Sequence, residues 1–118
     1  MDTDRLADEV ERLADRLRAL SDVRLARPLP PHPSRADAAR AVAQLLADRA
    51  AQLEGRQPRE LPRLPDLAVG DQVAVTGTDL VIAAAAVRGS EEGGEGDAGV
   101  LAAITAGVNA CRELRLAL

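Results

Sequence analysis

The sequence predicts an all-α protein, a small four-helix bundle whose helices are separated by proline-rich connectors. Apolar residues recur at the three- and four-residue spacing of amphipathic helices along most of the 118 residues, a length typical of one domain. Prolines and glycines gather in short segments between these stretches. The chain contains no Phe, Tyr or Trp. We therefore expect a core of Leu, Val, Ile and Ala, in which the helices approach one another closely.

The first helix is predicted over residues 3–25. Its apolar residues follow one another at intervals of four, three, four and three positions, which is the a/d pattern of a heptad seam. They are Leu6, Val10, Leu13, Leu17 and Leu20. Two interpretations of this seam remain open. It faces the rest of the bundle, or it forms the interface with a second copy of the chain in a homodimer.

A proline-rich segment, residues 27–33, ends this first helical region. Its four prolines remove backbone donors and favour a stiff, extended connector. Ser34 begins the next helix, and Asp37 stands in the place of the usual Glu of a capping box. This second helix is predicted over residues 35–54.

Gly55 is well placed to end the second helix, because glycine readily adopts the left-handed conformation of a helix C-terminus. Residues 56–65 form a second connector that contains three prolines. Leu61 and Leu64 are the apolar residues of this connector, and we expect them to pack onto the bundle.

Residues 66–88 fit two structures. As a helix capped by Asp66, the segment places an apolar face toward the core, made of Val69, Val73, Leu80, Ala84 and Val87. The small residues Gly70, Ala74 and Gly77 then form a groove that allows close helix contact. As a β-hairpin at about 72–83, the alternation of Val73 and Val75 would lead into a turn, giving an α+β fold. The alanine run at 83–86 favours the helix.

The last helix is predicted over residues 97–117, with Asp97 as its cap and Leu101, Ile104, Val108 and Cys111 along its apolar face. A flexible, acidic and glycine-rich loop is predicted before it, over residues 89–96. The whole chain, 1–118, is thus expected to form a single helical domain.

Composition disfavours several partner classes. The net charge is −4, and all 15 basic residues are arginine. An acidic chain without aromatic residues lacks the basic stripe and the stacking platforms of nucleic-acid-binding proteins, and it is not attracted to anionic membranes. We expect neither partner. No targeting segment is evident, so we expect a cytoplasmic location.

His32 and Cys111 are the single histidine and the single cysteine, and they lie far apart in the chain. One His and one Cys do not make a metal site. A catalytic thiol needs a neighbouring base, and Cys111 instead lies on an apolar helix face. We therefore expect no metal, no cofactor and no enzymatic activity.

Three polar residues interrupt the third helical segment. Gln72, Thr76 and Asp79 fall on one side of a helix, at positions i, i+4 and i+7. Such a stripe is an exposed face, or it contacts an arginine of another helix or subunit, or it orients a ligand. The preferred hypothesis is a non-enzymatic protein–protein interaction or self-assembly module, a homodimer or a partner of another helical protein. The alternative is a small-molecule carrier or sensor with an apolar pocket between helices, in which these three residues bind the ligand.

Overall fold

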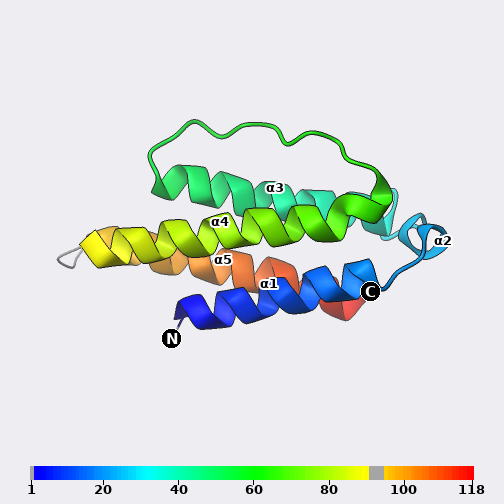
Figure 1. Ribbon diagram of the computed structural model, residues 1–118, viewed down its shortest axis with the longest axis horizontal. Coiled ribbons are helices and arrows are strands. Elements are labelled where there is room, and N and C mark those ends of the chain that lie inside the picture. Colours follow the sequence, from blue (N-terminus) through cyan, green and yellow to red (C-terminus); the bar gives the residue numbers. More distant parts are fainter. Residues whose placement is uncertain (1, 91–94) are drawn as a thin grey trace.

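Four long helices make up the bundle in the computed structural model, which describes residues 2–90 and 95–118 (Figure 1). They are α1 (Asp2–Arg18), α3 (Arg35–Leu53), α4 (Val69–Ser90) and α5 (Glu95–Ala117), with two short elements between them, α2 (Asp22–Leu25) and the 3₁₀ helix η1 (Asp66–Ala68). Apart from one isolated bridge between Leu29 and His32, the described residues contain no β-structure. The predicted all-α bundle is therefore confirmed.

The alternative β-hairpin at about 72–83 is wrong, because these residues lie inside α4. Val73, Leu80 and Ala84 are fully buried on one face, as the helical interpretation requires. In a strand, the alanine run after Ile82 would have had neither the propensity nor the bulk to pack on a sheet. The segment therefore forms a helix despite the β-branched residues at its centre.

The first predicted helix, 3–25, is divided in two. α1 ends at Arg18, and Ser21 caps the separate helix α2, where its Oγ accepts a hydrogen bond from the Arg24 backbone N at 3.3 Å. A Ser–Asp pair favours a new helix start over helix continuation, because the serine side chain satisfies free backbone donors. The break lets both Leu20 and Leu25 reach the core.

The first connector is a tight turn and not an extended segment. The backbone N of His32 donates to the Leu29 carbonyl at 2.8 Å across a cis Pro30–Pro31 bond. The chain then enters α3 at Ser34, whose Oγ accepts from the Asp37 backbone N at 3.0 Å, so the predicted cap is confirmed.

Gly55 ends α3, as predicted, with a φ of +70°. The backbone N of Arg56 then donates to the Ala51 carbonyl at 2.8 Å, which satisfies one of the last carbonyls of the helix. A side chain at position 55 would strain this left-handed conformation.

Residues 56–65, which we call the strap, run back along the whole of α3 (Figure 1). Ten residues in an extended proline-rich conformation span about 31 Å. This matches the length of about 28 Å expected for the 19 residues of α3. Because the strap returns to the start of α3, α4 runs parallel to α3 and antiparallel to α1.

α4 is the central helix and packs against α1, α3 and α5. Its contact with α1 uses the predicted small residues. A Cβ at Gly70 would lie 2.9 Å from the Cγ of Arg18, and a Cβ at Gly77 would lie 2.6 Å from Cγ2 of Val10. The predicted close approach is therefore confirmed, and it compensates for the absence of aromatic core residues.

The boundaries around α5 differ from the prediction. α4 continues to Ser90 and α5 begins at Glu95, so Asp97 lies within the first turns of α5 and not at its cap. The remainder of the predicted loop 89–96, residues 91–94, lies outside the described part of the chain. Asp66 likewise does not cap a helix, because Pro65 holds the cap position and the Asp66 carboxylate bonds to Arg40.

Leu101 is 49% exposed, and Val100 takes the core position on α5. The buried seam includes Gly107, whose Cβ would lie 2.9 Å from Cδ1 of Leu6. The other predicted core residues of this helix, Ile104, Val108 and Cys111, are buried as expected, so only Leu101 was misplaced.

Candidate functional site

The heptad seam of α1 lies in the core of the single chain. Its five residues are at most 5% exposed, which leaves them no free surface for a second copy. They are Leu6, Val10, Leu13, Leu17 and Leu20. The structure thus places the seam against the rest of the bundle, the first of its two interpretations. It does not bring these residues to an intersubunit position.

Gln72, Thr76 and Asp79 do not converge on one site. Gln72 is buried, and its Nε2 donates to the Pro62 carbonyl of the strap at 3.0 Å. Thr76 is also buried, and its hydroxyl donates to the Gln72 carbonyl one turn earlier in α4, at 2.9 Å. Asp79 is exposed. The arginine contact expected of this stripe is made instead by its neighbour Asp71, which pairs with Arg18 of α1 at 2.8 Å.

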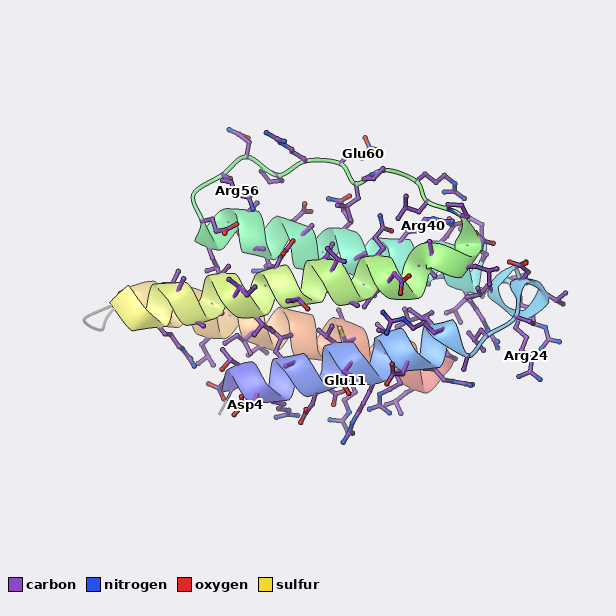
Figure 2. All side chains as sticks on the ribbon, in the orientation of Figure 1. Asp4, Glu11, Arg24, Arg40, Arg56 and Glu60 are labelled. Atoms are coloured by element: carbon purple, nitrogen blue, oxygen red, sulfur yellow. The ribbon has the colours of Figure 1, made fainter. Side chains whose placement is uncertain are left out.

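Side chains of α3 and α4 hold the strap by its backbone. Gln44 of α3 donates to the Arg59 carbonyl and accepts from the Leu61 backbone N, both at 2.9 Å. Arg40 donates to the Leu64 carbonyl at 2.6 Å and to Oδ1 of Asp66 at 2.7 Å. Figure 2 shows Arg40 beneath the strap. Leu61 packs against the core, as predicted, and Leu64 is half-buried.

A small apolar pocket of about 270 Å³ lies between the strap and α4. Gln72 and Thr76 line it, together with Leu61, Leu64 and Val75. Asp79 does not line this pocket, so two of the three predicted ligand-binding residues meet there and the third does not.

The surface of α4 differs from that of α1. Of the ten exposed residues of α1 only Ala7 is uncharged, whereas of the eight exposed residues between 69 and 89 only Asp71 and Asp79 are charged. Figure 2 labels two of these charged residues of α1, Asp4 and Glu11. Val75 and Ile82 of α4 are 62% and 59% exposed. A charged outer face is typical of a solvated helix, so the face of α4 is unusual.

Six exposed residues form a straight line along this face, at intervals of four, three, four, three and four positions. We call this line the outward stripe; it consists of Asp71, Val75, Thr78, Ile82, Ala85 and Gly89. The spacing is that of a heptad seam, and no helix in the described part of the chain covers it. This stripe could not be predicted from the sequence, because both the core face and the outward face of α4 consist mainly of small and apolar residues.

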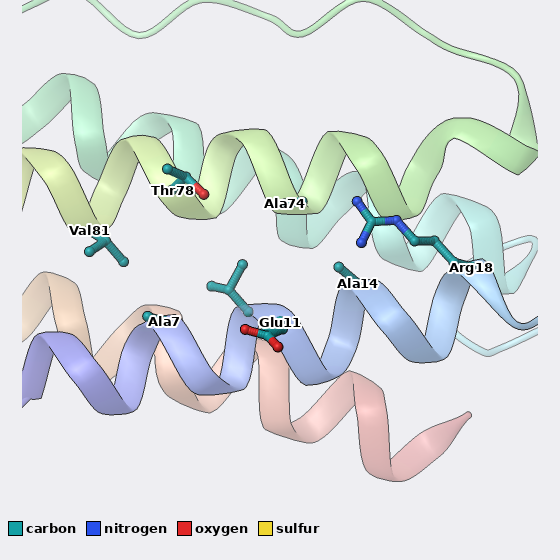
Figure 3. Close-up of a pocket in the computed structure, with 8 residues that line it drawn as sticks. Ala7, Glu11, Ala14, Arg18, Ala74, Thr78 and Val81 are labelled. Carbon is teal, nitrogen blue, oxygen red and sulfur yellow. The ribbon is translucent and has the colours of Figure 1, made fainter.

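A groove of about 290 Å³ borders the outward stripe on the side of α1 (Figure 3). Small side chains contribute much of its lining, among them Ala7 and Ala14 of α1 and Ala74 of α4. In Figure 3, Arg18 reaches from α1 toward α4 at one end of the groove. Its Nε donates to Oδ1 of Asp71 at 2.8 Å.

An ion pair joins α1 and α4 at each end of their contact, and the acidic partner belongs to α4 at one end and to α1 at the other. Asp71 accepts from Arg18 near the start of α4, and Arg88 donates to Asp2 at 3.3 Å near its end. The Asp71 side chain is 70% exposed, so its carboxylate can accept further hydrogen bonds. Between these ends the outward stripe is uncharged.

The thiol of Cys111 lies in the core between α1 and α5. Burial, and secondarily the negative charge of Glu9, raise its pKa to about 12. Glu9 is itself buried and pairs with Arg115 at 3.3 Å, a contact that sequence analysis did not anticipate. A thiol that stays protonated is not a nucleophile, and the prediction of a buried, small hydrophobic side chain is confirmed.

His32 is half-buried and lines a different pocket, of about 360 Å³, between the first connector, α3 and α5. Within the described ranges, no three side chains of His, Cys, Asp or Glu come together in a way that could hold a metal ion. The segment Asp66–Gly89 is long and apolar enough to cross a membrane by length and composition, and half of it is buried inside the bundle. A core helix passes the same test.

Comparisons with protein-family models, with curated proteins and with solved structures find no match to this chain. The function is therefore inferred from the geometry of the outward stripe and of the surfaces beside it.

Proposed function

We propose that this chain is a helical self-association module, which pairs with a second copy of itself through the outward stripe of α4. The observation that carries the proposal is the exposed heptad line of Val75, Thr78, Ile82 and Ala85, bordered by the α1–α4 groove. A line of this spacing buries its apolar residues when it meets a helix of the same kind. The surface of the bundle thus offers one helix face suited to helix–helix contact.

The residue composition of this face favours non-enzymatic contact with another helix. Ile82 and Val75 supply the apolar area, while alanine, threonine and glycine let a second backbone come near. We expect the contact of one helix pair to bury less than the ~1,200 Å² of total area at which stable complexes begin. We therefore expect a reversible dimer that forms at about micromolar concentrations.

Sedimentation velocity on the full chain and on two variants tests this proposal. Ile82→Arg places a charge in the middle of the stripe, where an unpaired buried guanidinium is costly. Leu116→Arg is the matched control, because Leu116 is 68% exposed on α5, away from the stripe. We expect the native chain and the control to dimerise with rising concentration, and Ile82→Arg to stay monomeric with unchanged helicity. If the sedimentation of all three proteins depends on concentration in the same way, the proposal is contradicted.

The pocket beneath the strap supports a second candidate function, the binding of a small apolar ligand. Its volume of about 270 Å³ lies at the lower limit for ligand sites, which run from about 300 Å³. Leu61, Leu64 and Val75 supply the apolar walls, and Gln72 supplies a polar group. A thermal-shift screen with small apolar compounds tests this candidate. A stabilisation that Val75→Asp removes would support it, and the absence of any stabilising compound would count against it.

A further inference from the structure

We infer, on the basis of the self-association proposed above, that the two copies pair α4 against α4 in an antiparallel register centred on position 80. The outward stripe is symmetric about this position. Antiparallel pairing therefore creates three kinds of layer, each present twice. These layers are Asp71 with Gly89, Val75 with Ala85, and Thr78 with Ile82 of the opposite copy.

Side-chain size favours this register. In each layer a larger side chain meets a smaller one, so a knob on one helix faces room on the other. A parallel pair would place Ile82 against its own copy and Ala85 against its own copy. The layers from Asp71 to Ile82 would then pair larger side chains with each other, while the layers of Ala85 and Gly89 would leave voids that lose packing energy.

Charge favours the same register. Antiparallel pairing brings the exposed carboxylate of Asp71 near Arg88 of the partner subunit, once at each end of the interface. Parallel pairing would instead bring the two Asp71 carboxylates together and align the two helix dipoles unfavourably. Asp79 is exposed and lies outside the three layers.

Cysteine cross-linking measures the register directly. A disulfide needs Cα atoms within about 7 Å of each other. Position 78 meets the partner's position 82 in the antiparallel pair, whereas two copies of position 78 are offset along the helix axis by about 6 Å. The native Cys111 is buried and does not interfere.

We expect a mixture of Thr78→Cys and Ile82→Cys chains to form covalent dimers on mild oxidation at least about tenfold faster than Thr78→Cys alone. Faster cross-linking of Thr78→Cys alone would overturn the antiparallel register and leave the proposed self-association intact. If neither sample cross-links and the unmodified chain sediments as a monomer, both the register and the self-association are overturned.

A size exchange within one layer provides an independent test. Val75→Ala and Ala85→Val should each weaken the dimer by about tenfold, because one leaves a void and the other overfills the layer. The double variant should return to within about threefold of the native affinity, because the same two side chains meet with their positions reversed. Additive weakening in the double variant would contradict this register. Circular dichroism of each variant checks that the fold is retained.

Discussion

Gly77 of α4 faces Val10 of α1 across a contact that leaves no room for a Cβ atom, which would lie 2.6 Å from the valine Cγ2. Val10 is 5% exposed and belongs to the core cluster, so it cannot turn outward to make room. This contact sets how closely α1 and α4 approach, and it fixes the position of the α1–α4 groove beside the outward stripe.

Gly77→Ala should therefore destabilise the fold by about 1–3 kcal/mol, the usual cost of overfilling a packed contact. Gly99→Ala is the matched control, because a Cβ at Gly99 would meet nothing within 4 Å. That control should stabilise α5 by about 0.5–1 kcal/mol, since alanine is the better helix former. Urea denaturation measures both changes, and the same sign for the two variants would contradict the predicted contact.

Arg40 should anchor the strap. Its side chain is 14% exposed and bonds to Asp37, to Asp66 and to the Leu64 carbonyl. Arg40→Met keeps most of the aliphatic packing and removes these charged hydrogen bonds, so we expect a loss of about 1.5–3 kcal/mol. Arg56→Met removes an exposed pair with Glu54 and should cost no more than about 1 kcal/mol. Urea denaturation of both variants tests the difference, and equal losses would show that Arg40 has no special role.

Stability should fall in acid in a way that depends on Asp37. Burial alone raises the pKa of this carboxyl, but the hydrogen bond from Arg40, the charge of Arg63 and the hydrogen bond with Ser34 outweigh burial and lower it. Since the folded pKa lies below the unfolded value of about 3.9, the stabilisation is present above about pH 4 and is lost as the pH falls through the folded pKa. The free energy of unfolding between pH 2 and pH 6 should therefore vary less for Asp37→Asn than for the native chain, and identical pH profiles would contradict this role.

Cys111 should resist thiol reagents in the folded protein. Burial, and secondarily Glu9, raise its pKa to about 12. Because the pKa of the thiol is higher in the folded than in the unfolded chain, its contribution to the stability of the fold is complete below the unfolded pKa of about 8.5. This contribution is lost as the pH rises toward the folded pKa. At pH 8, a thiol reagent should label the chain only at the rate of its unfolding. Labelling that is as fast as for a free cysteine would contradict the burial of this thiol.

The helices could be predicted from the sequence wherever the large apolar residues coincide with the buried face. Leu6, Val10 and Leu13 marked the core side of α1 correctly, and Ser34 and Gly55 marked both ends of α3. On α5 the prediction placed Leu101 in the core in place of Val100 and left out Gly107, because a residue without a side chain leaves no apolar signal. It also missed the break after Arg18, where a serine cap competes with a continuous heptad.

The parallel arrangement of α3 and α4 and the outward stripe could not be predicted. Residues 56–65 were recognised as a proline-rich connector, but their path along α3 depends on contacts made by Gln44 and Arg40. Gln72 and Thr76 were singled out correctly as polar residues in an apolar helix. Their role in the structure is to hold the strap and to satisfy the helix backbone. Val75 and Ile82 were not assigned to the predicted core face of the helix, and the packing of α4 shows that they are exposed.

Methyl NMR tests the central claim most directly, because the chain has two isoleucines with opposite environments. Ile82 is 59% exposed on the outward stripe, and Ile104 is 3% exposed in the core. In a dilution series of the full chain, labelled at the isoleucine δ1 methyl groups, the Ile82 signal should shift with protein concentration while the Ile104 signal stays fixed. If the Ile82 signal does not move between about 1 μM and about 1 mM, the range in which a one-helix interface should associate, the outward stripe is not a self-association surface.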